Sequence, residues 1–163
     1  MKFLCGYTLL EILICLGIIC LIVLMTVPAY TTLIENRALL ATAEAIAEDL
    51  RWARSEALKR NTDVSITYSP GEHWSYRIET ADGEQLKYLD NKLPDFARTS
   101  LSENFRKDST SFSPLRGSSE GKNGTLELVG VQTNSVLHIV LSNLGRVYIC
   151  SVQDGVGGLP KCS

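Results

Sequence analysis

The feature that most limits the possible folds of this sequence is a nearly uncharged N-terminal segment with a single acid inside it. Lys2 and Glu11 are the only charged residues among the first thirty, and an uncharged apolar run extends from Ile12 to Val27. With the apolar residues just before it, the run approaches the roughly 20 residues that cross a bilayer core. Lys2 precedes the run, which favours a cytoplasmic amino end. We therefore expect a single transmembrane helix over residues 7–30.

A cleaved secretory signal peptide is the alternative, because such peptides also join a basic start to a short apolar stretch. Two features argue against it. Glu11 places a carboxylate inside the apolar segment, which costs on the order of 2.5–3.5 kcal/mol on insertion scales and usually marks a function. The helical pattern also continues past Pro28 without an Ala-x-Ala cleavage site.

Residues 31–61 carry a second helical pattern, which is apolar on one side only. The apolar side chains recur at spacings of three or four and are Leu39, Ala43, Ile46, Leu50, Ala53 and Ala57. The alanines would let a β-sheet approach closely. Pro28 removes one backbone donor, so it either kinks the helix or ends it. The periodicity beyond Pro28 favours one continuous helix whose second half packs on the rest of the chain.

The remaining residues, 62–163, alternate between apolar and polar side chains in short runs separated by turn residues. The expected strands are 64–68, 74–78, 86–89, 125–131, 136–141 and 146–152. Residues 91–105 are expected to be irregular, and residues 109–124 to form a mobile loop beside a short strand. Six or seven strands on one long helix make an α+β domain.

The five cysteines fall into two groups. Cys5, Cys15 and Cys20 lie in the apolar segment and are expected to be small buried side chains. Cys150 and Cys162 flank a glycine-rich stretch and can form a disulfide if the domain lies outside the cytoplasm. Free thiols or a metal pair are the alternatives. Two cysteines without a nearby histidine make a poor zinc site, so we expect no metal and no cofactor.

The sequence contains no enzyme motif. A phosphate-binding loop, a Gly-x-Ser-x-Gly elbow and a metal-binding histidine pair are all missing, so we expect no catalysis. His73 and His138 lie in strand-like runs and are expected to be structural or surface residues. The net charge of −2 argues mildly against a protein that coats nucleic acid.

The segment Cys5-Gly6-Tyr7-Thr8-Leu9-Leu10-Glu11 resembles the processing signal of type IV pilins and type II secretion pseudopilins. The resemblance implies that residues 1–6 are a leader, that prepilin peptidase cuts between Gly6 and Tyr7, and that the new Tyr7 amine is methylated. Phe is usual after the cut, and Tyr7 keeps the ring. Glu11 of one subunit would pair with the Tyr7 amine of its neighbour, because each charge is costly alone in an apolar bundle. Pilin-like stems commonly carry a proline at the place of Pro28.

Three further stretches resemble the FimT/GspH family of minor pilins and pseudopilins. Leu50–Asn61 is similar to its helical pattern L-x-x-A-R-x-E-A-x-x-R-N. Phe112–Gly117 and Gly145–Cys150 are similar to its F-x-P-x-G and G-R-x-R-x-C signatures. Taken residue by residue, Arg54 and Glu56 read as simple surface charges. The resemblance implies a type IV pilin-like α+β fold, in which a long N-terminal helix packs on an antiparallel sheet.

Some FimT-type minor pilins bind DNA through arginines near the C-terminal Gly-Arg motif. Arg146 matches the first of these arginines, and Tyr148 replaces the second. Further positive charge would come from Lys161, Arg116 and Lys122, and the negative charge of Asp154 would oppose the binding of phosphate. Two or three cations predict weak, salt-sensitive binding.

These features together predict a FimT-like minor pilin that assists pilus biogenesis; the weak DNA binding would add a role in DNA uptake during natural transformation. One alternative is a GspH-like pseudopilin of a type II secretion system that acts in protein export. The other is a membrane-anchored binding protein that never polymerises. The expected partners are other pilins or pseudopilins, prepilin peptidase, the inner membrane and DNA. The expected location is the bacterial inner membrane, with residues 31–61 and the head at 62–163 in the periplasm.

Overall fold

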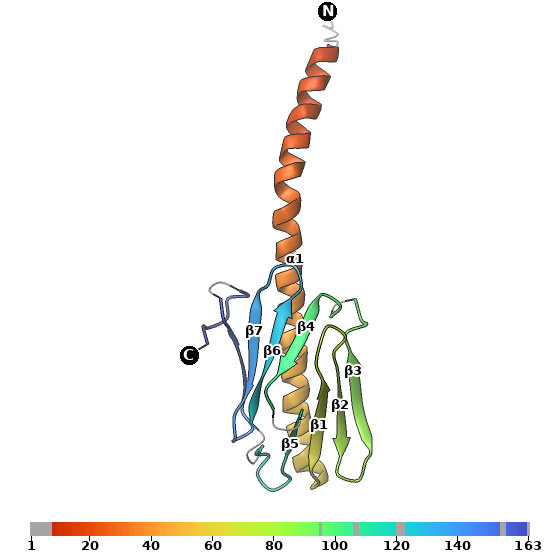
Figure 1. The fold of residues 1–163 in the computed structure, drawn as a ribbon, viewed down its shortest axis with the longest axis vertical. Coiled ribbons are helices and arrows are strands. Elements are labelled where there is room, and N and C mark those ends of the chain that lie inside the picture. Colours follow the sequence, from red (N-terminus) through yellow and green to blue (C-terminus); the bar gives the residue numbers. More distant parts are fainter. Residues whose placement is uncertain (1–7, 95, 106–107, 120–122, 154–155, 163) are drawn as a thin grey trace, which may run out of the picture. The chain divides into compact units, whose positions relative to one another are not determined.

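The computed structural model describes residues 8–94, 96–105, 108–119, 123–153 and 156–162, without the side chains at positions 25 and 27–29. Within them, the chain forms one helix followed by eight strands (Figure 1). Contacts divide the chain into an N-terminal unit that ends at Ile34 and a unit from Glu35 to Ser163, called the head unit below. The second half of the helix therefore belongs to the head unit.

Helix α1 extends from Leu9 to Arg60. The hydroxyl Oγ1 of Thr8 accepts a hydrogen bond from the Glu11 amide at 3.2 Å, which caps the first turn. At the other end, Asn61 has a left-handed φ of 52°, as expected for a residue that terminates a helix. The helix passes through position 28, so the continuation favoured by the sequence is confirmed and a helix end at Pro28 is excluded.

The eight strands form two antiparallel sheets. Sheet A has the order β3-β2-β1-β5 and contains β1 (Val64–Ser69), β2 (Ser75–Thr80), β3 (Gln85–Asp90) and β5 (Ser109–Phe112). Sheet B has the order β4-β6-β7-β8 and contains β4 (Thr99–Glu103), β6 (Gly124–Gly130), β7 (Val136–Leu141) and β8 (Val147–Ser151). Figure 1 shows the two sheets next to each other on the head-unit part of α1.

Strand β4 corrects the sequence prediction, which treated residues 91–105 as irregular. Only Leu101 among its five residues is a large apolar side chain, so the strand pattern is weak. Long-range contacts supply the order instead. β4 pairs with β6 along its full length, and the Trp74 indole donates to the Thr99 carbonyl and hydroxyl at 3.2 and 3.1 Å.

The apolar stripe predicted on α1 is confirmed as the centre of the core. Its six residues are at most 2% exposed: Leu39, Ala43, Ile46, Leu50, Ala53 and Ala57. They share one cluster with side chains of both sheets, among them Ile66 and Ile78 of sheet A and Leu128 and Ile139 of sheet B. Each large apolar side chain buried in this way stabilises the fold by about 1.5–3 kcal/mol. One face of the helix therefore holds the two sheets together.

The first residues of the head unit tie α1 to the β6–β7 connection. Glu35 is 1% exposed, and its Oε1 accepts a hydrogen bond from the Gln132 amide at 2.6 Å. The Ser135 hydroxyl donates to Asn36 Oδ1 at 3.0 Å. The other carboxylate oxygen of Glu35, Oε2, is buried without a hydrogen-bond partner among the described residues, so Glu35 anchors the backbone of this connection through Oε1 alone.

Two buried tyrosines face each other across β1 and β2 but differ in their hydrogen bonding. Tyr68 and Tyr76 are register partners with ring centroids 6.3 Å apart. The Tyr76 hydroxyl donates to Asp49 Oδ2 at 2.6 Å, and Lys87 Nζ donates to Asp49 Oδ1 at 2.6 Å. The Tyr68 hydroxyl has no hydrogen-bond partner among the described residues. Burial raises the pKa of both hydroxyls. The nearby negative charge of Glu103 raises the pKa of Tyr68 further, and the hydrogen bond to Asp49 does the same for Tyr76.

Replacing each tyrosine by phenylalanine should therefore have different effects on the free energy of unfolding. Tyr76→Phe removes a hydrogen bond to a carboxylate and should lower the free energy of unfolding by about 1.5–3 kcal/mol. Tyr68→Phe removes a buried hydroxyl without a partner and should leave that free energy unchanged or raise it by up to about 1 kcal/mol. Thermal melts of the full chain in detergent, followed by near-UV circular dichroism, measure both. Equal losses in the two variants would contradict this account.

Candidate functional site

The N-terminal unit presents apolar side chains around the whole circumference of α1. Each is at least half exposed: Leu9, Leu10, Ile12, Leu13, Ile14, Leu16, Ile18, Ile19, Leu21, Ile22, Val23 and Leu24. A helix that is apolar on every side is stable only when another apolar surface or medium covers it. This part of the chain therefore needs another apolar surface or an apolar medium to cover it.

No helix in the described part of the chain is both long and apolar enough to cross a membrane. The single membrane-spanning pass expected over residues 7–30 is therefore not confirmed. The expectation that the cysteines of this segment are buried is wrong for Cys15 and Cys20, which are free and exposed. Both cysteines lie on α1, and the neighbouring turns of this single helix do not cover their side chains.

Glu11 is exposed in the first turn of α1 and is the only acid there. Together with Thr8 it occupies the positions of a capping box, in which the fourth residue is commonly Glu. A negative charge also stabilises a helix N-terminus. Glu11 thus has a local role in starting the helix, whatever it contacts elsewhere. Gly6 and Tyr7, the predicted processing site, lie outside the described residues.

The three family-like stretches of the head unit meet at one place, which we call the glycine–arginine corner: Arg54, Gly117 and Gly145. Arg54 Nη1 donates to the Gly145 carbonyl at 3.3 Å. A Cβ on Gly145 would lie 2.2 Å from the Gly117 carbonyl oxygen, and one on Gly117 would lie 2.8 Å from Arg54 Nε. Both glycines also have left-handed φ values, 58° and 73°. Arg54 is therefore a packed structural residue, which corrects its interpretation as a surface charge.

Two of the predicted DNA-contacting residues lie beside this corner. Arg116 precedes Gly117, Arg146 follows Gly145, and both side chains are exposed. The Ser119 amide and hydroxyl donate to the carbonyls of Asn143 and Ser142 at 3.1 and 3.0 Å, which joins the two loops. The fold therefore brings two cations that are far apart in sequence to one edge of the head unit.

The other two predicted cations are not brought to this place. Lys161 forms an isolated parallel bridge with Ser151, at the opposite end of β8 from Arg146. β8 has five residues, so the two backbones are separated by about 16 Å of strand. Lys122 lies outside the described residues.

The predicted disulfide between Cys150 and Cys162 is present, with the two Cα atoms 5.1 Å apart. It fastens the C-terminal residues to β8, where the Ser151 amide donates to the Pro160 carbonyl at 2.9 Å. His138 lies against this disulfide, because it is the register partner of Cys150 on β7. The expectation that the two cysteines have no histidine nearby is therefore wrong.

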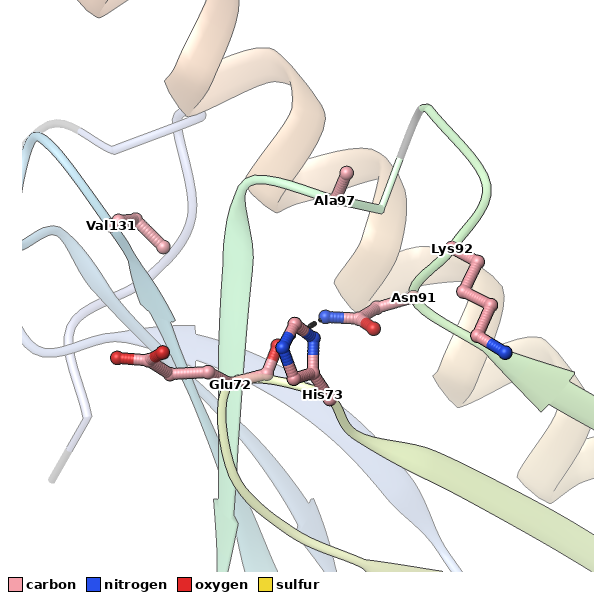
Figure 2. A pocket seen from close by; sticks show the side chains of 6 residues that line it. All are labelled: Glu72, His73, Asn91, Lys92, Ala97 and Val131. Atoms are coloured by element: carbon pink, nitrogen blue, oxygen red, sulfur yellow. Dashed lines mark hydrogen bonds between the residues drawn. The ribbon is translucent and has the colours of Figure 1, made fainter.

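A pocket of about 440 Å³ opens at one end of the head unit, lined by Glu72, His73, Asn91, Lys92, Ala97 and Val131. The Asn91 amide donates to the Glu72 carbonyl, so it is used in joining two loops. Figure 2 shows the Glu72 carboxylate and the Lys92 ammonium group pointing in opposite directions. A catalytic site requires functional groups that converge on one point, and the charged groups of this pocket do not converge.

The glycine–arginine corner predicts a large difference between two glycine variants. Gly145→Ala combines an unfavourable φ with a collision against backbone and should lower the free energy of unfolding by more than about 3 kcal/mol. Gly158→Ala is a matched control, since Gly158 has a similar φ of 68° but open space around its Cα. It should cost only about 1–2 kcal/mol. Thermal melting of both variants checks the difference, and similar losses would remove the steric argument.

The comparisons with known proteins agree with this arrangement. The family profile described as "Type II transport protein GspH" matches residues 42–145, which is more than half of the chain and includes the whole corner. Among solved structures, two crystal forms of the type IV minor pilin FimU from Pseudomonas aeruginosa PAO1 are similar. They align with TM-scores of 0.59 and 0.54 and 21% and 19% identity, covering 77% and 74% of this chain and 95% and 96% of FimU.

At these identities the FimU structures establish the fold alone. No protein of curated function matches the sequence. The matched residues 42–145 include the glycine–arginine corner, the stripe from Ala43 to Ala57 and strands β1 to β7. The chain is a member of the GspH family and has a type IV pilin-like α+β fold.

Proposed function

We propose that this protein is a minor subunit of a type IV pilus-like filament, with no catalytic activity of its own. The carrying observation is the helix surface from Leu9 to Leu24, which is apolar on all sides and exposed. Identical or related stems would cover one another when they bundle. Before assembly, the same segment would hold the subunit in the inner membrane with the head unit in the periplasm.

In this proposal, prepilin peptidase removes residues 1–6 and the mature chain starts at a methylated Tyr7. The new amine and Glu11 would then be opposite charges on stems of adjacent subunits. Bundling removes water from both, and a buried charge is tolerated when it is paired. The pair would set the axial register of each subunit in the filament, and Pro28 would adjust the direction of the stem.

Glu11→Ala should block incorporation of the subunit into filaments while leaving leader cleavage intact. Breaking a buried pair typically costs about 3–5 kcal/mol, so incorporation should fall by well over tenfold. Sheared filaments are assayed by immunoblotting, and cleavage is read from the mobility of the membrane-bound form. Glu44→Ala is the matched control, because Glu44 is an exposed acid on the same helix. Normal incorporation of the Glu11 variant would refute the pairing.

The same subunit design would serve a pseudopilus of a type II secretion system, which is the alternative function. The description of the matched family favours it, while the likeness in fold to FimU is equally compatible with a pilus. Co-purification after crosslinking in cells separates the two: major pilin in one case, secretion pseudopilins in the other. A chain that keeps its leader in the presence of prepilin peptidase would favour the non-polymerising membrane-anchored alternative.

A role in DNA uptake is a second candidate function, favoured by the exposed pair Arg116 and Arg146. Two phosphate contacts on duplex DNA predict weak binding, with a slope of log K against log salt of about −2.

Gel shifts with the full chain in detergent at low salt measure this binding. The double variant Arg116→Ala/Arg146→Ala should abolish the shift. Arg98→Ala is the control and should leave the shift unchanged. Arg98 is an exposed arginine just before β4, and its carbonyl accepts a hydrogen bond from the Val131 amide. Val131 follows the end of β6 that is farther from the glycine–arginine corner. Binding that survives the double variant would remove this site.

A further inference from the structure

A row of metal-ligating side chains crosses the outer face of sheet B. Glu127 of β6 is the register partner of His138 on β7, which is the register partner of Cys150 on β8. Directly opposed residues in antiparallel strands project to the same face, with Cβ atoms about 4.5–5.5 Å apart. The strand register alone therefore aligns a carboxylate, an imidazole and a sulfur.

The C-terminal segment adds a second sulfur beside this row. Cys162 is held against β8, and one ligand atom each from His138, Cys150 and Cys162 lies within 4.8 Å of the others. His138 Nε2 lies 3.5 Å from Glu127 Oε2. A cavity of about 410 Å³ is lined in part by His138, Cys150 and Cys162 and leaves room for an ion to reach them.

We propose that the head unit binds one Zn²⁺ when the Cys150–Cys162 disulfide is reduced. The ligands are the thiolates of Cys150 and Cys162 and the imidazole of His138, with a water in the fourth position, and the Glu127 carboxylate orients the imidazole. A tetrahedral zinc ion with bonds of about 2.0–2.3 Å keeps its ligand atoms about 3.3–3.8 Å apart. The imidazole nitrogen and the two sulfurs already lie within 4.8 Å of one another, so small side-chain movements suffice for the nitrogen. The two sulfurs reach it only after their covalent bond is broken, so disulfide and metal exclude each other.

The chemistry needs a dithiol reductant of the thioredoxin class. The dithiol gives two electrons and two protons, its own sulfurs become a disulfide, and Cys150 and Cys162 become two thiols. Zn²⁺ then binds the deprotonated sulfurs and releases the two thiol protons to solvent. Either covalent bond or metal fastens the C-terminal segment to β8, so the tail stays attached in both redox states.

The test uses the full chain in detergent with Cys5→Ser, Cys15→Ser and Cys20→Ser, which leaves Cys150 and Cys162 as the only cysteines. One sample stays oxidised, and the other is reduced with a phosphine that is then removed anaerobically. After incubation with Co²⁺ or Zn²⁺ and gel filtration, metal per chain is measured by mass spectrometry. We expect about one metal per reduced chain and none per oxidised chain. The cobalt form should show thiolate-to-cobalt charge-transfer absorption.

The two histidines of the chain provide the matched control. In the reduced protein, His138→Ala should weaken zinc binding by at least about tenfold, and His73→Ala should leave it unchanged. Glu127→Gln should weaken it less than His138→Ala. Far-UV circular dichroism verifies that each variant is folded. The proposal is overturned if the reduced chain binds no metal, if the oxidised chain binds equally well, or if His138→Ala binds as tightly as the parent protein.

Discussion

The head unit depends on one apolar face of α1, between Leu39 and Ala57. Two separate four-stranded sheets share this face, and an isolated bridge between Gly71 and Leu101 links the residues after β1 to β4. Three of the six stripe residues are alanines, which leave space for the side chains that the strands project inward. Cores of this density tolerate neither cavities nor extra volume. The helix is therefore the structural centre of the fold as well as its N-terminal extension.

The sequence predicts local features of this fold well and distant pairings poorly. The helix stripe and six strands follow from short-range periodicity, and the structure contains them within one or two residues of the expected limits. β4 was missed because its single apolar residue, Leu101, gives almost no alternation. The division into two sheets was also missed. It arises because β5 returns to β1 and β4 pairs with β6, and neither pairing leaves a local pattern.

The same limit applies to the functional residues. The local sequence predicts a surface charge at Arg54, because its partner, the Gly145 carbonyl, lies 91 residues away. His138 looked like an ordinary strand residue until the register of β7 and β8 placed it beside Cys150. By contrast, Cys150 and Cys162 are close in sequence, and their pairing was predictable. The family-like glycines were recognisable as a pattern, but their physical reason, the close approach at Gly117, is visible only in three dimensions.

The fastening of the C-terminal segment has a consequence for how copies of this chain can meet. β8 is an edge strand of sheet B, and exposed edges invite pairing with a strand of another molecule. At Ser151, however, the backbone amide donates to Pro160 and the carbonyl accepts from Cys162. Both main-chain groups of Ser151 are already hydrogen-bonded, and neither can pair with a strand of another molecule. Pairing with a strand of another molecule is therefore blocked at this end of β8.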